Sequence, residues 1–246
     1  MNLIIGKNSF ISKYLFRYVK GHYISHKEIN SINFKNYDNL ILLSFNPEFK
    51  KIKFENFDFE KKIFSHFTSK KVFFFSTSKI YPYGTNLTEK QEPNPVNLYG
   101  ENKLKIENIL QDFTDNFFIL RCSNIFKKDS YSDNSFLDIL LKNYNNYNKV
   151  IFDMSLKTRV DFILVDRVCK ILNELLINDN YGIYNISSGK GLSVEFIIEK
   201  ILKKTIKELN VEILNSKLKN QTLSNYKIRK ELNLQNNFIA ETINEL

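Results

Sequence analysis

The segment 71–124 constrains the fold of this chain more than any other part of the sequence. Two apolar stretches, 71–81 and 117–124, each end in polar residues, a pattern typical of strands buried on both faces. Between them, apolar residues recur at helical spacing at Leu104, Ile106, Ile109 and Leu110. A strand, a helix and a second strand in this order form one parallel crossover unit. The sequence therefore predicts an α/β fold built on a parallel sheet.

The predicted helix begins with a tyrosine and a lysine four residues apart, Tyr99 and Lys103. At this spacing both side chains lie on one face of a helix, one turn apart. A lysine beside a phenol lowers the pKa of the phenol from its usual value of about 10, because the cation favours the phenolate. Such a phenol is suited to general acid or base catalysis near neutral pH. Tyrosine and lysine are both abundant here, so the pair alone is more typical of an ordinary helix surface.

A strand, a turn and a helix are also predicted at the start of the chain, at 3–5, at 6–12 and up to about Val19. In an α/β protein, backbone amides and a helix N-terminus at this place face the pyrophosphate of a dinucleotide. The next strands are predicted at 21–25 and 40–44. The short spacing between these two strands indicates that the helix of this crossover is reduced or missing.

Further helices and strands are predicted along the rest of the chain. Helices are expected at 56–69, 136–141, 166–176 and 194–206, and strands at 150–152, 158–165, 181–186 and 211–213. In the first of these helices, the predicted core residues are Phe57, Phe64 and Phe67. The polar segment 126–134 is interpreted as a loop over the site, 143–148 as a polar bridge, and the C-terminal end as a helical tail.

These features together resemble the extended short-chain dehydrogenase/reductase family, in the branch that acts on nucleotide sugars. The motifs that carry the resemblance are Ser76-Thr77-Ser78, Thr88-Glu89, Pro93-Asn94-Pro95, Tyr99 with Lys103, Leu120-Arg121-Cys122-Ser123-Asn124, Asp161-Phe162-Ile163-Leu164-Val165-Asp166 and Gly182-Ile183-Tyr184-Asn185-Ile186. The resemblance implies a Rossmann-like doubly wound parallel sheet with a small C-terminal substrate-binding lobe. The expected division is a dinucleotide-binding core at 1–125 and a substrate-binding lobe at 126–246, interleaved with the last strands of the sheet.

The glycine loop departs from the family pattern, which is Gly-x-x-Gly-Phe-Ile-Gly. This chain keeps Gly6 and the pair Phe10-Ile11, but serines occupy the other two glycine positions, Ser9 and Ser12. Serine adds a Cβ where the backbone should approach the ligand closely. Its hydroxyl can, however, donate a hydrogen bond to phosphate.

The resemblance implies an NADPH or NADH cofactor. At the end of the second strand, a carboxylate favours NADH and cations favour NADPH. The candidates there include His26 and Lys27, with Glu28 just beyond, so NADPH is the preferred cofactor. The implied cofactor-binding residues are Gly6, Asn8, Ser9, Phe10, Ile11, His26, Lys27, Leu43, Ser44, Tyr99, Lys103 and Cys122.

The resemblance also implies the catalytic roles. Thr77 contacts the reacting sugar oxygen, Tyr99 exchanges the proton on that oxygen, and Lys103 holds the nicotinamide ribose and tunes Tyr99. A hydride moves between the nicotinamide and a sugar carbon, most often C4. Hydride addition creates an alkoxide, which requires an aligned acid and hydrogen-bond donors. The implied substrate-binding residues are Thr77, Ser78, Lys79, Asn124 and Arg159.

Residues that this chain lacks narrow the reaction. Family dehydratases carry Asp-Glu directly after the catalytic threonine, where this chain has Ser78 and Lys79, so dehydration is not expected. Lys79 also stands where a relative that epimerises at C3 and C5 has its cysteine. The favoured function is NAD(P)H-dependent reduction of a nucleotide-linked 4-keto sugar at C4, for surface polysaccharide or glycoconjugate biosynthesis. The alternatives are a nucleotide-sugar 4-epimerase and a non-catalytic relative that binds a nucleotide sugar.

Composition excludes several other classes of protein. The net charge of +9 comes from scattered lysines without a nucleic-acid-binding motif, so no nucleic-acid partner is expected. No apolar run approaches the roughly 18 residues of a membrane span, and the N-terminal apolar run is too short for a signal peptide.

The cysteines and histidines give no sign of disulfides or of a metal site. Cys122 and Cys169 fall in apolar segments and are expected to be buried thiols of a cytoplasmic protein. The histidines lack metal-ligand spacing, so no metal is expected. The expected partner is the nucleotide-sugar substrate, and a homodimer is compatible with these features.

Overall fold

The computed structural model describes residues 1–127, 136–202 and 210–234. These residues form two compact units. Unit 1 comprises Met1–Pro82, Glu89–Cys122 and Val165–Asn185, and unit 2 comprises the described residues of Tyr83–Thr88, Ser123–Leu164 and Ile186–Leu246. The chain thus leaves unit 1 and returns to it twice, so neither unit is one continuous stretch of sequence.

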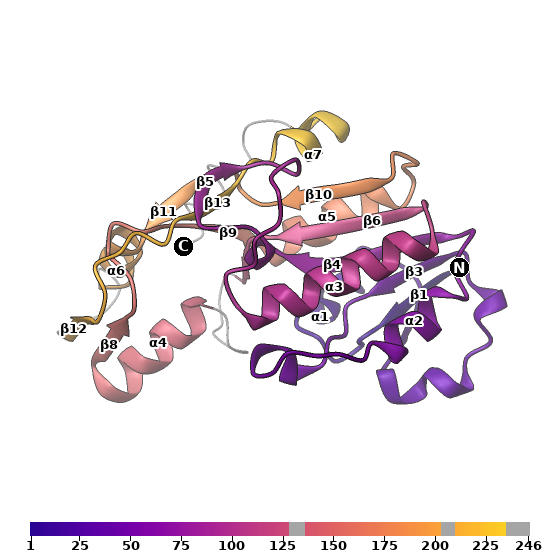
Figure 1. The fold of residues 1–246 in the computed structure, drawn as a ribbon, viewed down its shortest axis with the longest axis horizontal. Helices are drawn as coiled ribbons and strands as arrows, with labels where there is room; N and C mark the ends of the chain where they lie inside the picture. The colour runs from indigo at the N-terminus through magenta and orange to yellow at the C-terminus, as the bar shows by residue number, and fades with distance from the viewer. Residues whose placement is uncertain (128–135, 203–209, 235–246) are drawn as a thin grey trace. The chain divides into compact units, whose positions relative to one another are not determined.

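Unit 1 is built on a sheet of six strands in the order β10-β6-β4-β3-β1-β2 (Figure 1). The strands are β1 (Asn2–Ile5), β2 (His22–Ile24), β3 (Asn39–Leu42), β4 (Lys71–Thr77), β6 (Phe117–Cys122) and β10 (Gly182–Ile186). All pairs from β2 across to β6 are parallel. The strand order reverses between β1 and β3, which makes their carboxyl ends the switch point of a Rossmann-like fold. The predicted parallel α/β fold is confirmed.

Helices cover both faces of this sheet. They are α1 (Ser12–Leu15), α2 (Asp58–Phe64), α3 (Leu98–Phe113) and α5 (Val165–Leu175). Helix α2 packs with α3, and α1 packs with α5. In Figure 1, α3 runs across the front of the sheet and α5 lies behind it. The core on the α3 face contains the predicted core residues Phe57, Phe64 and Phe67, together with Ile106 and Leu110 of α3.

Two helices of unit 1 are shorter than the sequence pattern predicts. Helix α1 ends at Leu15, because the chain then turns and places the hydroxyl of Tyr18 2.8 Å from the Asp166 carboxylate. Helix α2 ends at Phe64. The crossover between β2 and β3 carries only the 3-10 helices His26–Ser31 and Phe34–Asn36, so the prediction of a reduced crossover is confirmed.

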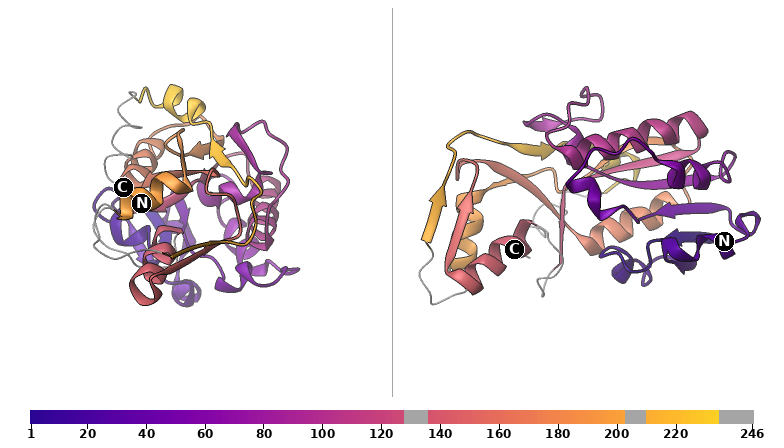
Figure 2. Two further views of the ribbon diagram at one scale, coloured as in Figure 1. Left: turned by 90° about the vertical axis from the view of Figure 1, so that its left-hand side faces the viewer. Right: turned by 60° about the horizontal axis from the view of Figure 1, so that its bottom comes forward.

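Unit 2 contains two further sheets and three helices (Figure 2). The larger sheet has the order β11 (Gly191–Ser193), β9 (Arg159–Leu164), β13 (Gln221–Leu223) and β5 (Gly84–Leu87), with β7 (Asn124–Phe126) paired to β9. The second is the parallel pair β8 (Lys149–Phe152) and β12 (Asn210–Ile213). The helices are α4 (Phe136–Tyr147), which lies against β8, α6 (Val194–Leu202) and α7 (Tyr226–Glu231).

Asp161 ties three segments of unit 2 together. Its fully buried carboxylate accepts hydrogen bonds from Ser188 Oγ at 2.8 Å and from Leu223 N at 3.3 Å. These bonds hold the loop after β10 and strand β13 against β9. The sequence pattern did not predict β13, because its polar residues Gln221 and Thr222 give no apolar signal although both are buried.

The polar bridge predicted at 143–148 is wrong, because α4 continues to Tyr147. Tyr144 is only 3% exposed and packs in the core of unit 2 with Leu140 and Val150. Burial of this aromatic ring offsets the low helix propensity of the neighbouring asparagines. Most of the loop predicted at 126–134, and residues 235–246 of the predicted helical tail, lie outside the described residues.

Three further features bear on the predictions from composition. In the ranges that the structure describes, no helix has the length and hydrophobicity needed to cross a membrane. The same ranges contain no cluster of three or more His, Cys, Asp or Glu residues that could hold a metal ion. Cys122 and Cys169 are both buried free thiols, as predicted.

Candidate active site

The predicted catalytic threonine lies at the carboxyl end of β4. Thr77 and Ser78 are both buried, and Thr77 Oγ1 accepts a hydrogen bond from Lys79 N at 3.2 Å. This bond caps a 3-10 turn over Ser78–Ile80. On the neighbouring strand β6, Cys122 pairs with Thr77 in the ladder. The ends of the two strands therefore place a hydroxyl and a thiol side by side.

The start of α3 packs directly on this turn. Asn97 caps the helix, since its side-chain oxygen accepts a hydrogen bond from Gly100 N at 2.9 Å. Gly100 is so close to the turn that a Cβ there would lie 2.2 Å from the carbonyl oxygen of Lys79. Only glycine allows this approach. It fixes Tyr99, which precedes Gly100, close to the turn that follows Thr77.

Lys103 anchors α3 to β4 one turn further along the helix. Its Nζ donates a hydrogen bond to the carbonyl oxygen of Phe75 at 2.7 Å, and the residue is 2% exposed. Nζ also lies 4.5 Å from the ring centroid of Phe74 and 5.9 Å from that of Tyr99. Burial lowers the pKa of Lys103 to about 8, because loss of hydration disfavours the ammonium ion.

The prediction that Lys103 lowers the pKa of Tyr99 is wrong for this structure. Burial raises the pKa of the phenol above its ordinary value, and the nearby Cys122 adds to the rise. The amine of Lys103 is hydrogen-bonded to Phe75, so its effect on the phenol does not outweigh burial. A phenol with a raised pKa keeps its proton at neutral pH, so this environment suits donation of a proton better than its removal.

A buried ion pair fixes the next turn of α3 against β6. The carboxylate of Glu107 accepts hydrogen bonds from Arg121 Nε at 3.1 Å and from Arg121 Nη2 at 2.7 Å. The exposed fractions of the two residues are 0% and 3%. Arg121 Nη1 also donates to the Tyr81 hydroxyl, which in turn donates to Asn185 Oδ1, both at 2.9 Å. This network joins α3, β6, β10 and the turn after β4.

The loop after β1 lies at the switch point of the sheet. Gly6 has a φ of 113°, and a Cβ there would lie 2.7 Å from Ser44 N, so the position requires glycine. Ser9 Oγ accepts a hydrogen bond from Ser12 N at 3.2 Å. Three buried hydroxyls, those of Ser12, Ser44 and Ser76, have no hydrogen-bond partner among the residues that the structure describes. Unpaired hydroxyls at this edge of the sheet fit a ligand rich in phosphate and ribose oxygens, as a dinucleotide is.

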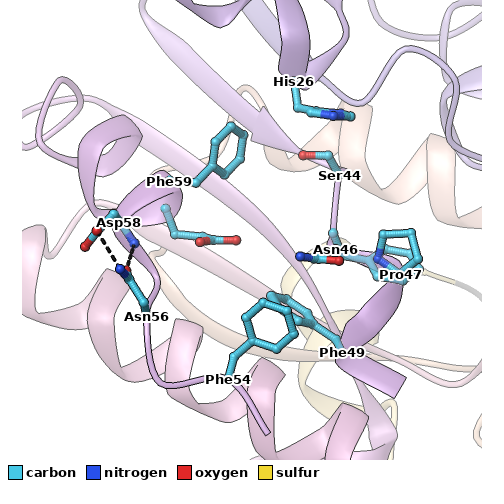
Figure 3. Close-up of a pocket in the computed structure, with 11 residues that line it drawn as sticks. His26, Ser44, Asn46, Pro47, Phe49, Phe54, Asn56, Asp58 and Phe59 are labelled. Carbon is cyan, nitrogen blue, oxygen red and sulfur yellow. Dashed lines mark hydrogen bonds between the residues drawn. The ribbon is translucent and has the colours of Figure 1, made fainter. Parts of the chain in front are cut away.

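A cavity of about 450 Å³ lies beside the carboxyl end of β3 (Figure 3). Its lining residues come from the ends of β2 and β3, from the 3-10 helix Pro47–Lys50 and from the region of α2. Figure 3 shows His26 and Ser44 on one side of the cavity and Phe49 and Phe54 on the other. The fold thus brings together two residues that the sequence assigned to the cofactor, His26 and Ser44.

The other predicted cofactor residues have simpler surroundings. Asn8 and Lys27 are exposed, whereas Phe10 and Ile11 are half-buried. Leu43 is buried, and its backbone N–H donates to the Ile5 carbonyl.

Lys7 and Glu28, at the ends of β1 and β2, form an ion pair at 2.7 Å. The Glu28 carboxylate also accepts a hydrogen bond from Ser25 N at 2.7 Å. A carboxylate that the sequence analysis placed just beyond the cofactor residues is thus already engaged by Lys7.

Two of the predicted substrate-binding residues belong to unit 2. Asn124 Nδ2 donates a hydrogen bond to the Asp161 carbonyl at 2.9 Å. Arg159 is exposed, and its Nη2 donates to the Gly191 carbonyl at 2.9 Å. Both side chains are thus held by backbone oxygens of their own unit.

Residues 54–187 match the model of the NAD dependent epimerase/dehydratase family. The chain belongs to this family. The matched segment contains Thr77, Tyr99 and Lys103, whereas the glycine loop lies outside it. A comparison with curated protein sequences finds no match.

Solved structures share the fold of the family at low sequence identity. One is a dTDP-4-dehydrorhamnose reductase from Bacillus anthracis str. Ames in complex with NADP, with a TM-score of 0.78, 16% identity, and coverage of 100% of this chain and 99% of that chain. A second is a UDP-N-acetylglucosamine 4-epimerase from Methanobrevibacter ruminantium M1, with a TM-score of 0.78, 16% identity, and coverage of 100% and 98%. A third is RMD from Pseudomonas aeruginosa complexed with NADPH, with a TM-score of 0.75, 15% identity, and coverage of 100% and 99%. These similarities establish the fold alone.

Several residues that shape this site received no role from the sequence. Gly100 is needed for the close approach of α3, and Glu107 and Arg121 form the buried pair. The one available signal was spacing, because Tyr99, Lys103 and Glu107 follow one another every four residues on one helix face. A fourth residue, Glu60 of α2, is buried and lines the cavity.

Proposed function

We propose that this protein is an NAD(P)H-dependent reductase that reduces the 4-keto group of a nucleotide-linked sugar at C4. The observation that carries the proposal is the grouping of Thr77, Tyr99 and Lys103 at the carboxyl edge of one parallel sheet, where burial raises the pKa of the Tyr99 phenol. Reduction of a ketone produces an alkoxide, which needs a proton at the moment it forms. A protonated phenol beside a buried ammonium is suited to that task.

The relatives with the same fold support the choice of cofactor and substrate class. Their structures are described as complexes with NADP, with NADPH or with UDP-N-acetylmuramic acid. The unpaired hydroxyls of Ser12, Ser44 and Ser76 and the glycine at position 6 fit a dinucleotide in this chain. NADPH is the preferred form, with His26 and Lys27 as the residues that would receive its 2′-phosphate.

Each residue of the site has a distinct task in the proposed reaction. The bound cofactor supplies the hydride. Tyr99 donates its proton to the sugar oxygen, and Thr77 donates a hydrogen bond to the same oxygen. Lys103 holds the nicotinamide ribose, and its positive charge stabilises the phenolate that Tyr99 becomes. For substrate binding, the family resemblance names Asn124 and Arg159 as further candidates.

The same residues disfavour the other reactions of the family. Elimination of water requires a further acid and base, but the two residues after Thr77 are Ser78 and Lys79. Burial lowers the pKa of Lys79 to about 8, within the range of catalytic lysines, so the case against proton abstraction at C3 or C5 rests on the missing cysteine and not on the charge of Lys79. A 4-epimerase must first remove a proton from a sugar hydroxyl, for which the raised pKa of Tyr99 is unfavourable.

The test is a screen of NADPH consumption against nucleotide-linked 4-keto sugars, followed by the variant Tyr99→Phe. Loss of the general acid should lower kcat by about a hundredfold or more, while NADPH affinity stays close to that of the wild type. Substrate turnover in deuterated water should leave C3 and C5 free of deuterium. Deuterium at either carbon would contradict simple reduction, and interconversion of 4-hydroxy sugars without net cofactor use would identify a 4-epimerase instead.

A further inference from the structure

The cavity beside β3 contains a carboxyl group that the proposed reaction does not use. Glu60 lies on α2, lines the cavity, and is only 7% exposed. Among the described residues, its carboxylate has a hydrogen bond to its own backbone and an electrostatic interaction with Lys103. Burial raises the pKa of Glu60 because a carboxylate loses hydration there. A buried acid with so few partners is costly unless a nearby charge compensates it.

Lys103 is the nearby charge, and it also lacks a dedicated counterion. Its Nζ lies 5.5 Å from the ring centroid of Phe45, which lines the same cavity as Glu60. Helices α2 and α3, which carry the two residues, pack against each other. The described residues contain no carboxylate within salt-bridge distance of Lys103, whose hydrogen bond goes to the Phe75 carbonyl.

The other groups that face Lys103 cannot serve as its counterion. Glu107 of α3 interacts electrostatically with Lys103, but this carboxylate is neutralised by Arg121 through hydrogen bonds as short as 2.7 Å. Cys122 of β6 also lies near Lys103, but burial raises the pKa of this thiol to about 12, so the thiol is uncharged. Tyr99 is protonated as well. The remaining group that interacts electrostatically with Lys103 is the carboxylate of Glu60.

We propose that Glu60 is the counterion of Lys103 between the packed helices α2 and α3, and that it acts as a positioning residue which keeps the Lys103 amine charged for catalysis. The role in catalysis rests on the proposed function, whereas the pairing itself does not. Without the carboxylate, a fully buried lysine would lose its proton near neutral pH. A neutral Lys103 could not stabilise the phenolate that Tyr99 forms when it donates its proton.

The chain offers a matched control in the same cavity. Asp58 lines the cavity and lies on the same helix, two residues before Glu60. Its Oδ2 accepts a hydrogen bond from Asn56 Nδ2 at 2.7 Å, and it is not among the groups that act on Lys103. The variants Glu60→Gln and Asp58→Asn therefore each remove one negative charge from the lining of the same cavity. Only Glu60→Gln removes a charge that interacts with Lys103.

The direct test is an NMR titration of protein labelled with 15N-lysine, in which Lys103→Met identifies the Lys103 signal. Glu60→Gln should lower the titration midpoint of Lys103 by about one pH unit or more, as expected for loss of a nearby opposite charge in a buried site. Asp58→Asn should leave the midpoint unchanged. An unchanged midpoint in Glu60→Gln, or equal shifts in both variants, would overturn the pairing.

The reciprocal measurement covers the case in which Glu60→Gln fails to fold. Labelled carboxyl groups report the titration of Glu60, which should move to higher pH in Lys103→Met if the two charges interact. No movement would overturn the proposal.

Activity then tests the positioning role. The decline of kcat/KM at high pH should begin at lower pH in Glu60→Gln than in Asp58→Asn, and Glu60→Asp should restore part of the difference. A titration shift without any change in the pH profile would refute the positioning role and leave the pairing intact. If no nucleotide sugar is reduced, the proposed function fails, but the titrations still decide the pairing.

Discussion

The start of α3 and the loop after β1 both lie at the carboxyl edge of the sheet in unit 1, but their polar groups are partnered differently. Along α3, Lys103 and Glu107 are buried and each has a buried partner, Phe75 and Arg121. In the region of the loop, the ion pair of Lys7 and Glu28 is about 40% exposed. The buried hydroxyl of Ser12 has no hydrogen-bond partner in the part of the chain that the structure describes.

This difference matches the task that each region has in the proposed reaction. Proton transfer requires that Tyr99 and Lys103 keep their positions to within a fraction of an ångström, which a helix anchored by buried hydrogen bonds provides. Cofactor binding requires polar groups that are still available to a ligand. The loop after β1 therefore has polar groups without partners, whereas the polar groups along α3 are bonded within the protein. Substitutions in the two regions should change stability in opposite ways.

The largest expected effect is at the buried ion pair of α3. Glu107→Gln leaves the Arg121 guanidinium buried without its counterion, which should destabilise the protein by about 3–5 kcal/mol. Thermal unfolding measures this loss. The control is Lys7→Gln in the other region, which breaks an ion pair that solvent already screens and should barely change the melting temperature. Equal losses of stability in the two variants would show that the buried and the exposed ion pair stabilise their regions equally.

The second effect concerns the contact between α3 and the turn after β4. In Gly100→Ala the new methyl group would overlap the Lys79 carbonyl, so the helix must move, at a cost of about 1–3 kcal/mol. Because Tyr99 moves with the helix, turnover should fall by more than the loss of stability explains. Gly84→Ala is the control, since a Cβ there meets only the flexible side chain of Leu87. Turnover in Gly100→Ala equal to that in Gly84→Ala would contradict the assigned role of this contact.

The same contrast explains how much the sequence could predict. The strands at 71–77 and 117–122 and the helix between them were predicted correctly, because apolar periodicity reports burial directly. The positions of Tyr99 and Lys103 on one helix face followed from spacing alone. Strand β13 was missed, and α4 was ended too early, because polar or asparagine-rich segments are buried there by contacts from distant parts of the chain.

Electrostatic pairing was the part of the site that the sequence could not give. Periodicity identifies Glu60, Glu107 and Arg121 as polar residues, but only the fold shows that they are buried and which charge each one meets. The pKa of Tyr99 was misjudged for the same reason. Spacing placed a lysine near the phenol, but the fold buries the phenol and binds the lysine to a backbone oxygen.

The smallest expected effect tests the loop after β1 itself and has opposite signs at two serines. Ser12→Ala removes a buried hydroxyl that has no partner, so it should raise the free energy of unfolding by about 1 kcal/mol. Ser9→Ala removes the oxygen that accepts the Ser12 N–H, so it should lower the free energy of unfolding by about 1 kcal/mol. Denaturant unfolding measures both changes.

Cofactor affinity then separates a structural from a ligand-binding role for the Ser12 hydroxyl. If this hydroxyl forms a hydrogen bond with the bound cofactor, Ser12→Ala should bind NADPH more weakly than the wild type by calorimetry, even though the variant is more stable. A variant that is more stable and binds NADPH as well as before would mean that Ser12 is a packing defect. A variant that is less stable would mean that the hydroxyl is paired within the protein. That result would contradict the proposed difference between the loop after β1 and α3.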